Sequence, residues 1–235
     1  MTLLLCIIVR KENRFTVIIE IEDRGYKAWI NNTGRLREYL RKGVKGFLIP
    51  NRGKNDYRLF AVSPYNGLAS IIDTLLQMKA FERCMENGLL PKFIGCRIQK
   101  RNASLYNSKI DYLLSCNTRS IYLEVKSAVL KKGEYAMYPD CPSIRGQRHI
   151  MDLIKNSERG ESAIMFIAAI PDIKYFTPYK EGDPLIYSLI SKAYHKGVKL
   201  YAIQIAYDIN MKRIMLINSE TPVILEEGIK THGVI

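Results

Sequence analysis

The sequence predicts an α/β protein (α+β overall) in two parts, an N-terminal OB-like β-barrel followed by a larger α/β domain. Three observations predict this. Short strand-like runs broken by turns fill residues 1–75, strand-like and helix-like segments alternate across residues 76–235, and 235 residues suit one large domain or two small ones. We therefore place the two domains at 1–75 and 76–235. A small β-sandwich would give a similar N-terminal pattern.

The N-terminal domain is predicted from the period of its apolar residues. Apolar and more polar side chains alternate along residues 14–21, which is typical of a strand with one buried face. The alternating apolar residues are Phe15, Val17, Ile19 and Ile21. The turn at 11–13 predicts that this strand forms a hairpin with residues 3–9. Further elements are predicted in order as a strand at 26–30, helical turns at 35–40, and strands at 45–49 and 57–62.

The C-terminal domain is predicted from alternating helix-like and strand-like segments. Residues 71–87 carry apolar side chains at helical spacing, and Gly88 is a natural helix end. The continuous apolar run 163–170 has the length of a strand buried on both faces. The remaining segments are predicted as strands at 108–114, 120–129 and 200–208, helices at 146–155 and 184–196, and short edge strands at 214–217 and 222–225.

Positive charge dominates the composition. Lys and Arg number 36 and Asp and Glu 23, which gives a formal net charge of +13. Such an excess favours a polyanionic partner, because phosphates neutralised by Lys or Arg release their condensed counterions. We predict nucleic acid as the partner; a membrane surface and a surface merely rich in lysine are the alternatives. The apolar run 3–9 is too short to cross a bilayer and lacks signal-peptide features, so we expect no membrane association and a cytoplasmic location.

The cysteines do not form a recognisable metal or redox motif. They are Cys6, Cys84, Cys96, Cys116 and Cys141. None is spaced as Cys-x-x-Cys, so a zinc site is not expected. The spacing leaves a disulfide open but does not indicate one, in keeping with a reducing cytoplasmic compartment.

Two strand-like segments carry the residues with the most chemical information. Alternate side chains of a strand point to one face, so Glu124 and Lys126 are expected to project together. If the two segments form a hairpin, Asp111 approaches Glu124 from the neighbouring strand. Two carboxylates there, with the carbonyl of Val125, suit Mg²⁺ or Mn²⁺, and Lys126 would orient water and stabilise phosphoryl charge. The alternative is that these residues only decorate an exposed sheet face.

Five ordered segments resemble the sugar fermentation stimulation protein (SfsA) family over nearly the whole chain. They are NTGRL at 32–36, ENGLLP at 86–91, DYLL at 111–114, YLEVKS at 122–127 and YPDCPSIRGQRH at 138–149. The resemblance implies an OB-like N-terminal domain joined to a PD-(D/E)XK nuclease-like domain. It also implies DNA binding and an association with the regulation of sugar metabolism, which does not require a nuclease.

The resemblance also implies roles for single residues. Asp111, Glu124 and Lys126 match the nuclease-like core, and Glu82 matches an acid from the preceding helix, so Glu82, Asp111 and Glu124 are the predicted ligands for Mg²⁺ or Mn²⁺. His149 is predicted as a catalytic proton donor to the leaving oxygen.

Basic and polar residues of both domains are predicted to contact nucleic acid. The predicted contacts are Asn32, Thr33, Arg35 and Arg37 in the first domain and Arg145 and Arg148 in the second. Tyr26 and Trp29 offer stacking faces, although a folding role is the expected one for Trp29. Ser143 is expected to cap the helix that follows it.

The predicted function is a DNA-binding protein with a metal-dependent phosphodiesterase, or nuclease, site. The alternatives are a non-catalytic DNA-binding regulator of sugar metabolism and a hydrolase that acts on RNA or nucleotides. The sequence leaves the oligomeric state open, with a homodimer among the states allowed.

Overall fold

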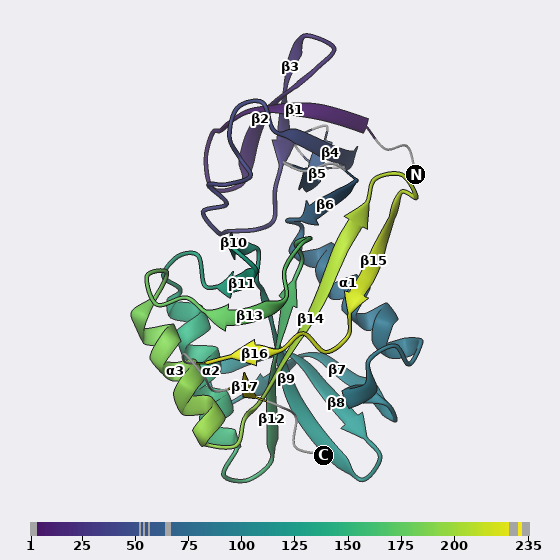
Figure 1. Ribbon diagram of the computed structural model, residues 1–235. Helices are drawn as coiled ribbons and strands as arrows, with labels where there is room; N and C mark the ends of the chain where they lie inside the picture. The colour runs from purple at the N-terminus through teal and green to yellow at the C-terminus, as the bar shows by residue number, and fades with distance from the viewer. Residues whose placement is uncertain are drawn as a thin grey trace.

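The structure, a computed structural model, describes residues 4–51, 53, 55, 57–63, 67–225 and 230–231. A barrel lies at the top of Figure 1, and an α/β unit lies below it. Leu3, the first residue of the strand predicted at 3–9, lies outside the described residues. Within these residues, none of the helices has the length and apolar character needed to cross a bilayer.

The barrel is built from the first strands of the chain. They are β1 (Leu4–Lys11), β2 (Thr16–Ile21), β3 (Arg24–Trp29), β4 (Lys45–Pro50) and β5 (Tyr57–Ser63). They lie in the order β3-β2-β1-β4-β5, and β5 pairs with β3 to close the ring. The predicted hairpin is confirmed, since β1 pairs with β2 in antiparallel fashion. Val17 and Ile19 have no exposed surface, as their alternation predicts. The N-terminal domain is therefore an OB-type barrel.

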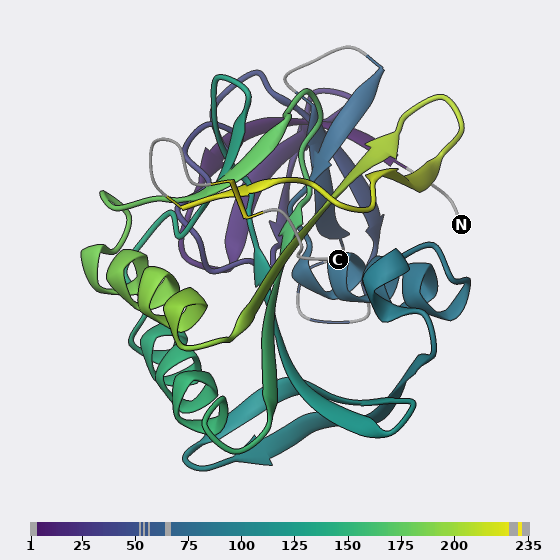
Figure 2. The ribbon, with the colours of Figure 1, turned by 60° about the horizontal axis from the view of Figure 1, so that its bottom comes forward.

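The α/β unit has a mixed sheet with helices on both faces. Its main elements are α1 (Thr74–Glu86), β7 (Cys96–Leu105), β8 (Ser108–Cys116), β9 (Arg119–Ser127), α2 (Ile144–Asn156), β12 (Glu161–Ala168), α3 (Pro184–His195) and β14 (Lys199–Asp208). The sheet order is β14-β12-β9-β8-β7, with β12 parallel to β14 and β9. Figure 2 shows α2 and α3 on one face of this sheet and α1 on the other.

The apolar run of β12 is buried on both faces, as predicted. Ile164 and Phe166 pack into the apolar cluster that includes α2 and α3. Met165 and Ile167 belong to the second apolar cluster, which includes α1 and the barrel. A strand with helices on both faces has no solvent-exposed face, which explains the continuous run of apolar residues.

Short strands connect and extend these two units. β6 (Leu68–Ile71) pairs with β5 of the barrel and with β14 of the α/β sheet, so the two sheets are continuous. β15 (Arg213–Asn218) pairs with β14. A separate small sheet contains β10 (Leu130–Lys132), β11 (Tyr135–Tyr138), β13 (Tyr175–Pro178), β16 (Val223–Ile224) and β17 (Lys230–Thr231). A 3₁₀ turn, η1 (Pro91–Phe93), follows α1.

Several boundaries differ from the predictions. The helix predicted at 71–87 begins at Thr74, because Asp73 caps it by accepting from the Leu76 N–H (2.9 Å). The predicted domain boundary at 75/76 therefore falls in the first turn of α1. The helical turns predicted at 35–40 form a single hydrogen-bonded turn, in which Leu36 has a positive φ of 51° that a helix does not allow.

The structure contains a disulfide, which the spacing of the cysteines left open but did not indicate. β7, a strand that the sequence analysis missed, pairs with β8 so that Cys96 lies directly opposite Cys116. Their Cα atoms are 4.0 Å apart and their side chains form a disulfide. Cys6, Cys84 and Cys141 are free.

Candidate functional site

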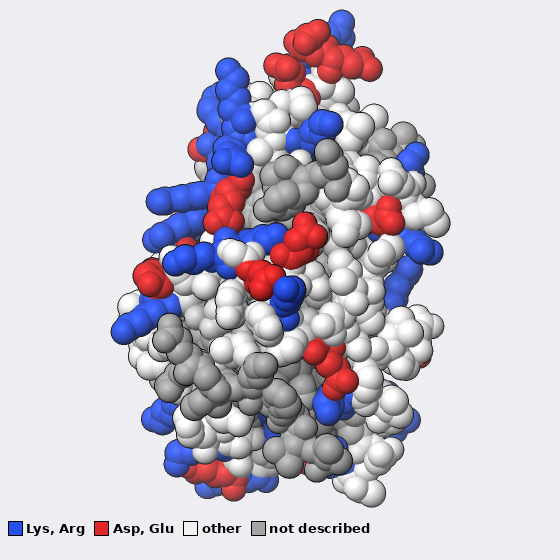
Figure 3. Space-filling view, viewed as in Figure 1, with Lys and Arg blue, Asp and Glu red and all other residues white. Residues whose placement is uncertain are grey.

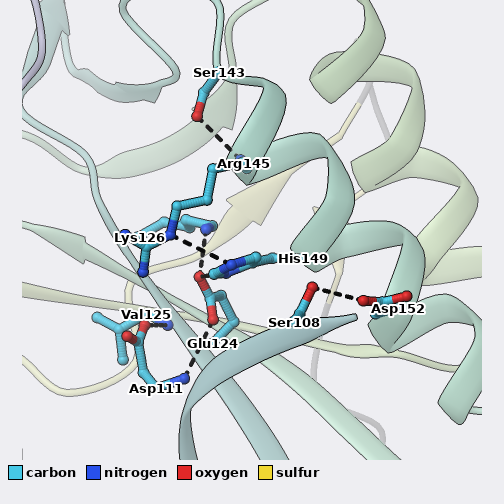
Figure 4. Close-up of polar contacts among 10 residues, drawn as sticks. Ser108, Asp111, Glu124, Val125, Lys126, Ser143, Arg145, His149 and Asp152 are labelled. Atoms are coloured by element: carbon cyan, nitrogen blue, oxygen red, sulfur yellow. Dashed lines mark hydrogen bonds and ion pairs between the residues drawn. The ribbon is translucent and has the colours of Figure 1, made fainter. Parts of the chain in front are cut away.

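Asp111 of β8 and Glu124 of β9 lie beside each other in the hairpin (Figure 4). The register pairs Tyr112 with Leu123, which places the two acids at adjoining positions. The Asp111 N–H donates to Glu124 Oε2 (3.3 Å), and the Val125 N–H donates to Asp111 Oδ2 (2.8 Å). The hairpin therefore brings the two acids together, as the strand pattern predicts.

Glu124 is the centre of a buried polar network. Lys126 Nζ and His149 Nδ1 each lie 2.6 Å from Glu124 Oε1, and Arg145 Nε lies 3.4 Å from His149 Nε2 (Figure 4). Because Arg145 can only donate, the imidazole accepts at Nε2 and donates from Nδ1 to Glu124. Glu124 exposes 2% and Lys126 8% of its surface. Their burial excludes the alternative of an exposed, decorative triplet.

Burial and mutual charge set the protonation of this group. Burial, together with the neighbouring Glu124, raises the pKa of Asp111 to about 6. Burial alone would raise the pKa of Glu124, but the Lys126 ammonium and the His149 hydrogen bond hold it below its ordinary value. Burial alone would lower the pKa of Lys126, but the Glu124 carboxylate keeps it above its ordinary value. Lys126 is therefore a protonated ammonium at neutral pH and is no general base.

Replacing Asp111 by asparagine is expected to stabilise the protein at neutral pH in EDTA. The pKa of about 6 in the folded protein exceeds the ordinary value of 3.8, so the folded state binds this proton more tightly than the unfolded chain. The ionised Asp111 carboxylate therefore destabilises the folded state. This destabilisation is absent below about pH 4, grows as the pH rises, and is complete above about pH 6. Asparagine keeps an oxygen for the Val125 N–H without a charge. We expect about 1–3 kcal/mol more stability at pH 7, at roughly 1.4 kcal/mol per pKa unit.

Urea unfolding of wild type and Asp111→Asn at pH 4 and pH 7 measures this effect. The difference between the two proteins should appear at pH 7 and largely vanish at pH 4. Glu158→Gln, which neutralises an exposed carboxylate on the loop after α2, is the matched control. A loss of stability in Asp111→Asn at pH 7 would show that the ionised Asp111 carboxylate does not destabilise the folded protein.

The two acids line the floor of a cleft of about 430 Å³ between the barrel and the α/β unit. One wall is the barrel loop 31–34, and another is the first part of α1, including Gln77. The segment from Tyr138 through the first turn of α2 completes the cleft, and it includes Arg145. The carboxylates therefore lie in a cleft that residues of both domains line.

Asn31 and Asn32 join the barrel to α1. The Asn31 side chain accepts from the Thr74 N–H (3.0 Å) and donates to the capping carboxylate of Asp73 (2.8 Å). The Asn32 side chain is buried and donates to the carbonyl of Ile72 (3.1 Å). The Asn32 amide is thus used inside the protein, and its contact with nucleic acid stays a prediction.

The other basic and polar residues predicted to contact nucleic acid are exposed. Thr33, Arg35 and Arg37 point outward and alternate with buried Gly34 and Leu36. Arg145 and Arg148 are exposed on α2, and Arg145 lines the cleft. Figure 3 shows Lys and Arg side chains gathered along one edge of the molecule beside the barrel. Their role in binding stays a prediction.

The segment 138–149 forms a wall of the cleft through close contacts. Asp140 Oδ2 accepts from the Leu36 N–H of the barrel (3.2 Å). A Cβ at Gly34 would lie 2.6 Å from this carboxylate, so only glycine allows the approach. Ser143 accepts from the Gly146 N–H (3.0 Å), which confirms it as the cap of α2.

The structure does not bring Glu82 to this cleft. Its carboxylate accepts from Arg101 (2.9 Å) and from the hydroxyl of Tyr112 (2.8 Å). The part of α1 that lines the cleft is its beginning, and Glu82 lies near its end. Glu82 therefore lies apart from Asp111 and Glu124, which both line the cleft, and its role as a cation ligand stays a prediction.

Local sequence patterns missed one contact that shapes the cleft. Lys11 Nζ donates to the carbonyls of Gly34 (2.8 Å) and Arg35 (3.2 Å), which holds the barrel loop in place. The residues lie 23 and 24 positions apart, so no local spacing could have indicated the contact.

The donors at the cleft floor fit an oxygen-preferring divalent cation. Asp111 and Glu124 repel each other, as the raised pKa of Asp111 reflects, and a cation between them would relieve that repulsion. Over the ranges that the structure describes, His, Cys, Asp and Glu side chains form no group of three or more suited to a metal. Two carboxylates suit Mg²⁺, which keeps several waters and takes few protein ligands.

Family models match most of the chain. Residues 9–71 match the SfsA N-terminal OB domain, and residues 75–211 match the sugar fermentation stimulation protein RE domain. These two matches follow the barrel and the α/β unit in order.

Named relatives cover most of the chain as well. A sugar fermentation stimulation protein homolog of Pyrococcus furiosus is 48% identical over 200 residues, covering 84% of this chain and 86% of the relative. The homolog of Archaeoglobus fulgidus is 43% identical over 204 residues, covering 86% and 88%. The solved structure of Pyrococcus furiosus SfsA in complex with Ca²⁺ is 44% identical with a TM-score of 0.90, covering 95% of this chain and 96% of that one.

Proposed function

The chain belongs to the sugar fermentation stimulation protein (SfsA) family, and from this premise we propose that it binds nucleic acid, DNA in particular, and hydrolyses phosphodiester bonds with a divalent cation. One observation carries the proposal. Asp111 and Glu124 lie with Lys126 at the floor of a cleft whose walls come from an OB-type barrel and an α/β unit. OB barrels bind nucleic-acid strands, and paired carboxylates hold the cations used in phosphoryl transfer.

The proposed cation is Mg²⁺ or Mn²⁺, held by Asp111 and Glu124. When bound, it polarises the phosphoryl group and lowers the pKa of a bound water. The related Pyrococcus furiosus protein was solved with Ca²⁺, another cation that prefers oxygen ligands. That relative supports the choice of a divalent cation.

The side chains around Glu124 have separate roles in this proposal. Lys126 stays protonated, keeps Glu124 ionised and adds positive charge at the cleft floor. His149 is buried and is not among the residues that line the cleft, and both of its ring nitrogens are engaged. We therefore assign His149 to positioning Glu124, in place of the proton-donor role predicted from the sequence. Arg145 supports His149 through Nε alone in the described part of the chain, which leaves its Nη groups for a phosphate.

A specific observation favours the second candidate, a DNA-binding regulator without catalysis. Glu124 is already bonded to Lys126, His149 and the Asp111 N–H. A carboxylate saturated in this way stabilises the hairpin without a cation, and the ligand set lacks a third acid among the described residues. In this candidate the two acids stabilise the fold, and nucleic acid binds only through exposed basic residues such as Arg35, Arg37, Arg145 and Arg148.

Removing basic residues near the cleft is expected to reduce the salt dependence of DNA binding. Each phosphate contact contributes about 0.9 to the slope of log affinity against log salt concentration. Arg35→Ala/Arg37→Ala and Arg145→Ala/Arg148→Ala should therefore each lower the slope by roughly 1–2. Fluorescence anisotropy of a labelled duplex over a salt series, in EDTA, measures the slope.

The control variant removes two exposed lysines at the end of the α/β unit far from the barrel. Lys199 begins β14, whose other end pairs with β6 next to the barrel, and Lys192 lies near the end of α3. Lys192→Ala/Lys199→Ala should keep the wild-type slope. Equal slopes in all variants would place the nucleic-acid surface elsewhere and would contradict the proposed cleft.

A further inference from the structure

An aromatic side chain at the tip of the β1–β2 hairpin is exposed, although its place in the alternating apolar pattern predicts burial. Phe15 has the same strand parity as Val17 and Ile19, which are fully buried, yet it exposes 46% of its surface. It lies immediately before β2 begins, where the chain has left the interior of the barrel. Arg14, also exposed, places its guanidinium 5.5 Å from the centre of the Phe15 ring. Proteins that bind single-stranded nucleic acid use aromatic side chains for stacking, together with arginine.

This hairpin tip adjoins a segment that lines the cleft. The Phe15 carbonyl accepts from the Ile30 N–H (3.0 Å), and the next residue, Asn31, lines the cleft. Burial raises the pKa of the Cys141 thiol, and the positive charge of Arg14 acts in the opposite direction, which places Arg14 in the neighbourhood of this residue of the cleft wall. Phe15 and Arg14 therefore lie next to segments that line the cleft.

The other stacking faces predicted for the barrel are half-buried and contact neighbouring side chains. The guanidinium of Arg58 lies 5.3 Å from the Trp29 ring. Tyr26 packs edge-on against Tyr57 with ring centres 5.6 Å apart. Among the barrel residues that the structure describes, Phe15 is the exposed aromatic side chain.

We propose that Phe15 stacks on an unpaired nucleobase and that the substrate is nucleic acid with a single-stranded segment. The proposal rests on the proposed nucleic-acid function and adds its substrate class. In a duplex the faces of the bases are covered by their neighbours along the helix, so a protein ring stacks on a base that is unpaired or at an end. Arg14 supplies positive charge for the adjoining phosphate and a cation–π contact.

The test compares binding of a short single-stranded oligodeoxynucleotide with binding of the same strand annealed to its complement. Both carry 2-aminopurine, whose fluorescence reports stacking, and EDTA prevents cleavage. Phe15→Ala should weaken single-strand binding about fivefold to a hundredfold, the range expected for losing one stacked base. Duplex binding should stay unchanged, and Phe15→Trp should keep the wild-type affinity and quenching.

Tyr106→Ala is the matched control. Tyr106 lies in the turn between β7 and β8, exposes 42% of its surface, and has Lys155 Nζ 4.1 Å from its ring centre. The Tyr106→Ala variant therefore removes a similar exposed aromatic–cation pair outside the cleft. It should bind the single strand and the duplex like wild type. Equal melting temperatures of the variants exclude a folding defect at the hairpin tip.

The outcomes separate this inference from the proposed function. If wild type binds DNA and Phe15→Ala binds the single strand equally well, the stacking proposal is wrong and nucleic-acid binding stands. If Phe15→Ala weakens single strand and duplex alike, the single-strand preference is wrong. If wild type binds neither form, the proposed function fails and the stacking proposal fails with it.

Discussion

Alanine at Asp111 or Glu124 is expected to abolish cleavage while DNA binding stays nearly intact. The two carboxylates are the protein's donors to the proposed cation, and neither belongs to the exposed basic surface. Loss of one group that stabilises the transition state costs about a hundredfold to a thousandfold in rate, so we expect at least that reduction. Initial rates of cleavage of a labelled oligonucleotide in Mg²⁺ or Mn²⁺, with affinities measured in EDTA, separate the two effects.

Glu134→Ala is the control for this prediction, because it removes an exposed carboxylate whose ion pair with Lys174 lies on the surface. It should cleave like wild type. Cleavage at the wild-type rate by Asp111→Ala or Glu124→Ala would reject the assignment of these residues. A parallel loss of affinity in EDTA would instead show that they support the binding surface.

Lys126→Met is expected to produce the largest loss of stability. The Lys126 ammonium is the buried partner of Glu124, and removing it leaves a carboxylate that is 2% exposed with His149 as its remaining side-chain partner. Breaking a buried ion pair from one side costs about 3–5 kcal/mol, because the remaining charge is not compensated. The free energy of unfolding in urea measures this cost.

The double variant Glu124→Gln/Lys126→Met tests whether the loss of stability comes from the uncompensated charge of Glu124. It removes both charges together, and an uncharged pair of similar volume often costs little. We expect the double variant to recover most of the stability that Lys126→Met loses. If the two variants are equally unstable, the cost comes from packing around Lys126 and not from an isolated buried charge.

The strand pattern was sufficient to predict the centre of the site. Period-2 alternation placed Glu124 and Lys126 on one face, and the hairpin placed Asp111 beside Glu124. The buried run of β12 and the cap at Ser143 were predicted for the same reason, since each depends on residues close together in the sequence. Local periodicity determines local geometry.

Contacts between distant segments could not be predicted in this way. His149 reaches Glu124 across 25 positions, and Asn32 reaches Ile72 across 40. Glu82 matched the family pattern, but its place near the end of α1 directs it to Arg101. These outcomes depend on how the units pack, which no spacing within one segment records.

Two further features could not be predicted, and the second depends on the first. Most side chains of β7 are polar and exposed, so the strand carries no apolar alternation that would identify it. The Cys96–Cys116 pair follows only from the register of β7 against β8. Without the strand, the disulfide had no basis in the spacing of the cysteines.

The most direct test of the account is incubation of the purified protein with labelled single- and double-stranded DNA and RNA in Mg²⁺, Mn²⁺ or EDTA, beside Glu124→Ala. We expect cleavage of DNA that requires the cation and is absent in the variant. Cleavage of RNA alone would keep the site but change the substrate. Tight binding without cleavage under every cation condition would contradict the catalytic proposal and favour a DNA-binding regulator.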